Sequence, residues 1–328
     1  MPGATEPPAF HHEPVMLDRV VELLGGVGPG ILVDATVGGG GHARALLEAN
    51  AGLRLLGLDQ DDAALAASER LVADFPGRVT LVRSRFDRLT EVVADEAGGS
   101  PVVAVLFDLG VSSPQLDRAE RGFSYRVSAP LDMRMDRRAS RTARDVVNEE
   151  SETELAAVLA RYGDERYASR IARAIVTARP VETTDQLADI VRGAIPAPAR
   201  RRGGNPAKRT FQALRIEVNR ELDILPAAID AAVDVLAPAG RIVVLSYHSG
   251  EDRIVKDRLR EAETGGCVCP PGLPCVCGAE PKVRLLRRGG WTPDAAELAR
   301  NPRAESARLR AAERLAQPAG ADENGSPT

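Results

Sequence analysis

A short apolar segment, Ile31 to Val33, is followed by Asp34 and then by four consecutive glycines, Gly38 to Gly41. The next residues, His42 to Ala49, have the composition of a helix. A strand that turns through glycines into a helix lets a ligand approach the main chain closely, because the turn carries no side chains. The segment therefore predicts a Rossmann-like α/β sheet with a ligand site at the carboxyl end of its first strand.

A second predicted strand, Leu53 to Leu58, ends in Asp59. A carboxylate about 20 residues beyond the glycines is placed to accept hydrogen bonds from the hydroxyls of a ribose. Asp59 therefore indicates that the ligand contains a nucleoside.

The local pattern leaves the identity of this ligand open. Gly38-x-Gly40-x-x-Ala43 fits the relaxed fingerprint of dinucleotide-binding sites, so a nicotinamide enzyme is one interpretation. Asp34 before the glycines favours S-adenosylmethionine, which carries an ammonium and a sulfonium but no pyrophosphate. A glycine turn that binds nothing is the third interpretation.

The rest of the chain continues the alternation of strands and helices that is typical of a parallel sheet covered by helices. The pattern breaks after the strand Val102–Asp108, where residues 116–210 contain several helix signals and no convincing strand. We therefore predict a discontinuous sheet domain, residues 11–115 and 211–316, with a helical insertion at 116–210. Residues 1–10 and 317–328 are rich in Pro, Gly, Ala and polar residues and are expected to be disordered tails.

Composition limits the class of protein. The chain has 328 residues, 44% of them hydrophobic, and a formal net charge of −4, so no global attraction for nucleic acid is expected. No apolar run has the roughly 20 residues of a membrane span, and the first residues do not have the pattern of a signal peptide. We expect a cytoplasmic protein with reduced cysteines that acts on neither membranes nor DNA.

Beyond the glycines, several short segments occur in an order that identifies a family. They are His12–Val15, Asp34–His42, Asp108–Leu116, Arg121–Tyr125, Pro130–Met135, Lys208–Ile216, Ser246–Arg253 and Asn301–Ala304. In these segments the chain resembles the ribosomal RNA small subunit methyltransferase H family over nearly its whole length between the tails. Two small departures, the extra Gly39 and Gly250 where a leucine is expected, touch no proposed ligand.

The resemblance implies a class I S-adenosylmethionine-dependent methyltransferase with an inserted helical domain. The implied reaction is methylation of the exocyclic N4 amino group of cytidine 1402 in the decoding region of 16S rRNA, within a largely assembled 30S subunit. The resemblance also implies a set of cofactor-binding residues. They are Gly40, Gly41 and His42 at the methionine end, Asp59 at the ribose, Phe86 at the adenine, and Asp108 and Gln115 at the edge shared with the acceptor base.

Two residues are candidates for the chemistry. The amino nitrogen of cytosine is a poor nucleophile because its lone pair is delocalised into the ring, so an acceptor for its protons would assist transfer. Asp108, or a carbonyl beside it, is placed to be that acceptor, and the alternative is that Asp108 only binds cofactor. His248 follows another strand and could orient the base or contact phosphate, or could be a polar loop residue satisfied locally.

Basic residues are concentrated in two runs that flank or lie within the predicted insertion. The candidate RNA contacts are Arg134 and Arg137 in the first run, and Arg201, Arg202, Lys208 and Arg209 in the second. We expect these runs to lack compensating acidic residues in an otherwise acidic protein, which favours contact with the RNA backbone over a merely solvated face. Phe123 and Tyr125 could stack on bases, or could equally pack in the core.

All four cysteines fall in one short segment, as Cys267-x-Cys269 and Cys275-x-Cys277 around a Pro-Gly turn. Two such pairs could bring four thiolates onto one structural zinc ion, within a loop spanning 263–281. The alternative is a reduced, metal-free turn that is held by its prolines. A non-catalytic RNA-binding factor that merely keeps the sheet is the competing function, and the intact candidate ligands argue against it.

Overall fold

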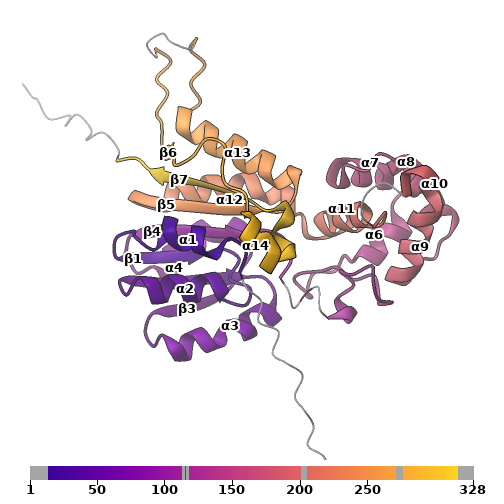
Figure 1. Cartoon of the computed structure of the whole chain (residues 1–328), viewed down its shortest axis with the longest axis horizontal. Coiled ribbons are helices and arrows are strands. Elements are labelled where there is room, and N and C mark those ends of the chain that lie inside the picture. Colours follow the sequence, from indigo (N-terminus) through magenta and orange to yellow (C-terminus); the bar gives the residue numbers. More distant parts are fainter. Residues whose placement is uncertain (1–13, 113–114, 116–117, 201–204, 271–275, 317–328) are drawn as a thin grey trace, which may run out of the picture.

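The computed structural model describes residues 14–112, 115, 118–200, 205–270 and 276–316, which form a sheet domain and a separate helical unit (Figure 1). The sheet has seven strands in the order β3-β2-β1-β4-β5-β7-β6. The strands are β1 (Gly30–Asp34), β2 (Leu53–Asp59), β3 (Val79–Arg83), β4 (Val102–Asp108), β5 (Leu236–Ser246), β6 (Val283–Leu285) and β7 (Arg308–Arg314). The first five are parallel, and β7 runs antiparallel to both β5 and β6. The predicted Rossmann-like sheet is confirmed.

Helices cover both faces of this sheet. One face packs against α1 (Leu17–Leu24), α2 (Gly41–Ala49) and α3 (Asp62–Asp74), and the other against α4 (Leu89–Glu96), α12 (Glu221–Val235) and α13 (Ser249–Thr264). Because apolar side chains of the central strands are buried on both faces, those strands consist of nearly continuous apolar residues. Shorter helices complete this domain, namely η1 (Phe86–Arg88), α14 (Ala295–Arg300) and η3 (Pro302–Ser306).

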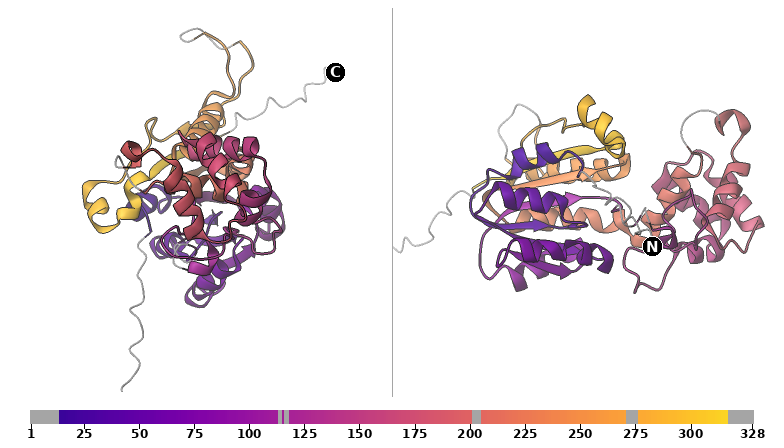
Figure 2. Two further views of the ribbon diagram at one scale, coloured as in Figure 1. Left: turned by 90° about the vertical axis from the view of Figure 1, so that its right-hand side faces the viewer. Right: turned by 60° about the horizontal axis from the view of Figure 1, so that its bottom comes forward.

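The helical unit lies beyond the carboxyl ends of the parallel strands (Figures 1 and 2). It contains η2 (Ala119–Arg121), α6 (Ala143–Glu149), α7 (Glu152–Gly163), α8 (Ala168–Thr177), α9 (Thr184–Ala194), α10 (Ala197–Arg200) and α11 (Lys208–Asn219). The unit has a hydrophobic core of its own, so it is a structural unit rather than a long loop. The Ser151 capping box at the start of α7 is formed, with Glu154 as its partner.

The helical unit extends further along the chain than the predicted limit at residue 210. Helix α11 continues to Asn219, and its residues Phe211 and Leu214 are buried in the core of the helical unit. The break comes at Arg220, which has a φ of 55° and joins α11 directly to α12 of the sheet domain. The predicted limit falls short because the sequence does not show that α11 packs in the core of the helical unit. Within the described part of the chain, no helix combines the length and apolar character that a membrane crossing requires.

Candidate active site

Three aspartates stand at the carboxyl ends of neighbouring strands. Asp34 ends β1, Asp59 ends β2 and Asp108 ends β4. Asp34 pairs with Gly57 of β2 and Leu106 of β4, so Asp59 and Asp108 each lie two residues beyond a partner of Asp34. Side chains two residues apart share a face of a sheet, and the three carboxylates therefore gather on one face at one edge.

Asp34 is the most deeply buried of the three, with 2% of its surface exposed. Burial raises its pKa from 3.8 to about 7, although the nearby charge of His42 and a hydrogen bond from the backbone of Thr36 act in the opposite direction. A buried carboxylate with a raised pKa is stabilised by any cation placed beside it, because the cation favours the charged form.

The four glycines of the turn, Gly38 to Gly41, differ in how closely other residues pack against them. A Cβ at Gly40 would lie 2.5 Å from Leu71, and a Cβ at Gly41 would lie 2.5 Å from Pro14, so these two positions allow close packing of the turn. A Cβ at Gly39 would meet no atom within 4 Å, and one at Gly38 none closer than 3.7 Å. The open side of the turn therefore lies over Gly38 and Gly39, which are not among the cofactor-binding residues that the family resemblance implies.

Asp59 accepts hydrogen bonds from the backbone N–H groups of Gly38, over 3.0 Å, and Asp61, over 2.9 Å. Burial is the main reason that its pKa is raised to about 6. A carboxylate has about four acceptor positions, so these contacts do not use all of them, and a ribose hydroxyl can still donate to Asp59. Phe86 follows β3 at the same edge, and its ring meets Phe107 edge-on at 5.8 Å between centroids.

Asp108 is held from two sides. The hydroxyl of Tyr247 donates to its Oδ1 over 2.5 Å, and Nδ1 of His42 lies 3.4 Å from its Oδ2. The Asp108 side chain nevertheless keeps 28% of its surface exposed, so the carboxylate is fixed in direction and still accessible. Sequence reasoning missed Tyr247, although its place directly after the end of β5 was the available signal.

The ring of His42 is buried, with its Nε2 lying 2.9 Å from the carbonyl of Val15. Burial lowers the pKa of His42, but the hydrogen bond and charge of Asp108 outweigh this effect and raise it above its usual value. The structure thus places His42 behind Asp108, where the imidazole can support the carboxylate.

Gln115 contacts Asp61 instead of an open surface. Its Nε2 donates to Oδ2 of Asp61 over 2.8 Å, and its Oε1 accepts from the backbone N–H of Ser112. The same Asp61 carboxylate forms a buried ion pair with Arg121, over 2.8 Å. Gln115 and Arg121 therefore tie the segment after β4 and the start of the helical unit to α3 beside the site.

His248 caps α13. Its Nδ1 accepts a hydrogen bond from the backbone N–H of Glu251, over 3.4 Å, and its Nε2 lies 3.1 Å from Oε1 of the same residue. The Glu251 carboxylate in turn accepts from the backbone N–H of Tyr247, over 2.7 Å. These contacts give His248 and Glu251 a structural role in positioning Tyr247. The buried Nε2 of His248 has no hydrogen-bond partner among the described residues, so the ring is only partly satisfied by its surroundings, and a direct role in the chemistry stays a prediction.

The first basic run is largely neutralised by acidic residues that are nearby in space. Arg134 forms a bidentate pair with Asp132, with both N···O distances at 2.8 Å, and also donates to two backbone carbonyls. Arg138, Arg141 and Arg144 likewise pair with acidic side chains. The sequence-based argument from missing acids is therefore wrong for this run. Arg137 is exposed, as Arg138 is, but it forms no ion pair within the described part of the chain.

The second run begins outside the described residues, since Arg201 and Arg202 are not among them. Lys208 and Arg209 open α11, are exposed, and have no acidic residue beside them in the first turn. Arg209 also donates to the carbonyl of Asp164 over 2.8 Å. A helix N-terminus with two cations and no acid favours an anion such as phosphate.

Of the two interpretations of the aromatics, the structure supports core packing. Phe123 is 7% exposed and belongs to the core of the helical unit. The Tyr125 ring meets Phe211 edge-on, with 5.6 Å between their centroids.

Comparison with known proteins decides the assignment. Residues 9–315 match the family described as the MraW methylase family. The chain belongs to the MraW methylase family. Curated relatives named "Ribosomal RNA small subunit methyltransferase H" cover almost the same length. The relative from Heliobacterium modesticaldum is 52% identical over 93% of this chain and 99% of its own. The relative from Thermobifida fusca is 56% identical over 95% of this chain and 96% of its own length. The relative from Frankia alni is 57% identical over 93% of this chain and 95% of its own length.

As a MraW-family methylase, the chain needs a methyl donor, and its residues fit S-adenosylmethionine. The buried carboxylate of Asp34 suits a cationic methionine end, the turn at Gly38 and Gly39 is open, and Asp59 retains acceptor positions. Among the described residues, three interacting carboxylates lie at this edge, and their negative charge disfavours an anionic pyrophosphate. The nicotinamide interpretation therefore fits less well.

Proposed function

We propose that the chain methylates the N4 amino group of cytidine 1402 in 16S rRNA, with S-adenosylmethionine as methyl donor, in the cytoplasm. The names of its relatives support small-subunit ribosomal RNA as the substrate class. The position of Asp108 carries the chemical part of the proposal. Its carboxylate is accessible and oriented by Tyr247, and its backbone N–H donates to the hydroxyl of Thr36, two residues before the glycines, over 2.7 Å.

When bound, S-adenosylmethionine supplies an electrophilic methyl group on a sulfonium. Asp108 would accept a hydrogen bond from one N–H of the cytosine amino group, which concentrates the lone pair on nitrogen as the new N–C bond forms. The nitrogen gains a positive charge in that step, and Asp108 would take the proton that leaves. Tyr247 and His42 keep the carboxylate facing the reaction site, so most of the work is alignment.

The helical unit is the proposed RNA-binding surface, and the 30S subunit is the proposed form of the substrate. Lys208, Arg209 and Arg137 would contact phosphates, and Arg201 and Arg202 remain candidates on sequence grounds. A base within folded RNA must leave its stack to enter a site at the edge of this sheet.

A transfer assay with the purified full chain tests the proposal. The substrates are 30S subunits and protein-free 16S rRNA from a strain that lacks this protein, with methyl-labelled S-adenosylmethionine. Nucleoside analysis should find one N4-methylated cytidine, formed on the 30S subunit and absent with Asp108→Asn. Asp95→Asn, an exposed aspartate on α4, is the matched control and should retain activity. Label on another nucleoside, or full turnover by Asp108→Asn, would overturn the assigned position or role.

A further inference from the structure

The loop between α13 and β6 has a closed base. The backbone N–H of Lys282 donates to the carbonyl of Ala262 over 2.8 Å, and that of Cys267 donates to the carbonyl of Thr264 over 3.2 Å. Gly265, with a φ of 61°, ends α13 so close to Glu280 that a Cβ would lie 2.4 Å from its carbonyl carbon. The two arms of the loop therefore leave the domain side by side.

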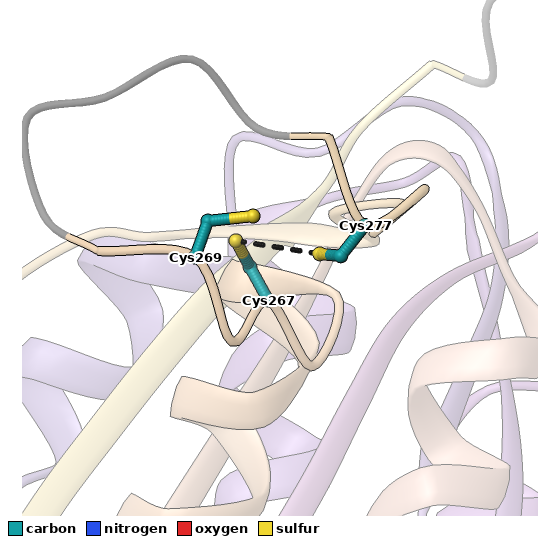
Figure 3. A group of neighbouring side chains, drawn as sticks. All are labelled: Cys267, Cys269 and Cys277. Atoms are coloured by element: carbon teal, nitrogen blue, oxygen red, sulfur yellow. Dashed lines mark hydrogen bonds between the residues drawn. The ribbon is translucent and has the colours of Figure 1, made fainter.

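Cysteine side chains from both arms converge above this base (Figure 3). Cys267 and Cys269 come from the first arm and Cys277 from the second, and their three sulfur atoms all lie within 4.8 Å of one another. The sulfurs of Cys267 and Cys277 are 3.7 Å apart. A tetrahedral zinc site with Zn–S bonds of about 2.3 Å places its sulfurs about 3.8 Å apart. The distance between Cys267 and Cys277 matches this spacing, and Cys269 lies within 4.8 Å of both.

Apolar packing does not explain why the three thiols meet. The residues that alternate with the cysteines, Val268 and Val276, are 86% and 89% exposed. The backbone N–H of Val276 instead donates to Sγ of Cys269, over 3.4 Å. Closely spaced cysteine pairs that converge from two arms of one loop are typical of structural zinc sites.

We propose that Cys267, Cys269 and Cys277 bind a zinc ion that holds the two arms of the loop together. Each thiol loses its proton to solvent when it binds, and neither the metal nor the sulfur changes oxidation state. Soft thiolate ligands select zinc over the hard cations magnesium and calcium. Cys275, the fourth cysteine of the segment, lies outside the described residues, and the proposal does not depend on it.

The zinc site would be structural and remote from methyl transfer. Helix α13 begins beside Tyr247 and ends at the loop, and its 16 residues span about 24 Å. The loop therefore lies at the far end of α13 from the candidate active site (Figure 1). The proposal is independent of the proposed function, because zinc content can be measured without any substrate.

Elemental analysis of the full chain, purified under reducing conditions without added metal chelator, tests the site. We expect about one zinc per chain. After Co²⁺ replaces the zinc, the protein should show the intense thiolate-to-metal absorption near the ultraviolet. The triple variant Cys267→Ser, Cys269→Ser, Cys277→Ser should lose at least 90% of the metal. Val268→Ser and Val276→Ser change the same loop without touching sulfur, and both should retain the zinc.

The decisive contrary result is a well-folded, reduced chain that contains no zinc and gives no thiolate absorption when Co²⁺ is added. A disulfide between Cys267 and Cys277 that persists in reducing buffer would also overturn the proposal. It would appear as a protein mass two hydrogens below that of the fully reduced chain. Limited proteolysis supplies a second measurement, since zinc should protect the loop in the wild type and in both valine variants, but not in the triple variant. Equal cleavage with and without zinc would contradict the proposed role in holding the arms together.

Discussion

The hydroxyl of Tyr247 donates a 2.5 Å hydrogen bond to Oδ1 of Asp108, and this contact links the ends of the neighbouring strands β4 and β5. Burial, followed by the charge of Asp108, raises the pKa of Tyr247 well above 10, so the phenol remains a donor throughout the physiological range. Glu251 fixes the backbone of Tyr247 from behind. Asp108 is thus oriented by a chain of contacts that begins in α13.

Replacing Tyr247 by Phe removes the donor and keeps the ring. We expect kcat for RNA methylation to fall roughly 10- to 100-fold, because the Asp108 carboxylate is no longer held toward the acceptor. The Kd for S-adenosylmethionine should change less than about threefold, since Tyr247 acts through Asp108. Single-turnover kinetics and calorimetric titration measure the two quantities.

Tyr125→Phe is the matched control for that experiment. Tyr125 lies in the helical unit and contacts Phe211 through its ring, which the substitution preserves. The kcat of the Tyr125→Phe variant should equal that of the wild type. If Tyr247→Phe also retained the wild-type kcat, Tyr247 would have no part in positioning Asp108.

Asp34 should make both stability and cofactor binding depend on pH. Its pKa is about 7 in the folded chain and 3.8 when unperturbed, so the folded chain retains a proton that the unfolded chain releases. This contribution to the free energy of unfolding is fully present below about pH 4 and is lost as the pH rises through 7. Asp59, whose pKa is about 6, acts in the same direction.

A cationic ligand offsets the cost of ionising Asp34 in the folded chain, because it stabilises the charged carboxylate. Affinity for S-adenosylmethionine should therefore rise between about pH 6 and pH 8 in the wild type. In Asp34→Asn the affinity should be weak and nearly independent of pH over that range. Calorimetric titration at several pH values measures this dependence, and an unchanged pH profile in Asp34→Asn would remove Asp34 from the methionine end of the site.

Sequence patterns predicted the sheet well because its determinants are local. Apolar runs that end in aspartate, such as Ile31–Asp34 and Val102–Asp108, specify buried parallel strands and the edge at which they end. The glycine run likewise specifies a turn that only small residues can form, as the close approach of Pro14 to Gly41 shows.

The parts that were not predicted depend on contacts between distant segments. The neutralisation of the first basic run depends in part on Glu150 and Glu182, which lie up to 38 residues away from their arginine partners. The end of the helical unit depends on where Phe211 packs, which periodicity cannot show. The capping role of His248 becomes visible only once the start of α13 is known.

Cationic residues that remain unneutralised should contribute to RNA affinity. Lys208→Ala and Arg137→Ala should each weaken binding of 30S subunits and lower the slope of log K against log salt by about one. Arg138→Ala is the matched control, since Arg138 already forms a bidentate pair with Asp136. A filter-binding salt titration measures these slopes, and equal slopes in all three variants would place the RNA on another surface.

The buried pair between Arg121 and Asp61 should couple the helical unit to the sheet domain. Both side chains are 3–4% exposed, and the Arg121 guanidinium also donates to the carbonyl of Arg134 over 2.8 Å. Removing one partner of a buried pair leaves an uncompensated charge, so Arg121→Met should lower the free energy of unfolding by about 3–5 kcal/mol.

Double-mutant cycles distinguish this pair from ordinary surface pairs. The cycle of Arg121→Met with Asp61→Asn should give a coupling energy of about 1–3 kcal/mol in urea unfolding. The neighbouring pair between Arg83 and Asp62 has an N···O distance of 3.0 Å but side chains that are 40% and 69% exposed, so its cycle should give less than about 1 kcal/mol. Equal coupling energies for the two pairs would show that Arg121 does not anchor the helical unit, because burial is the feature that separates them.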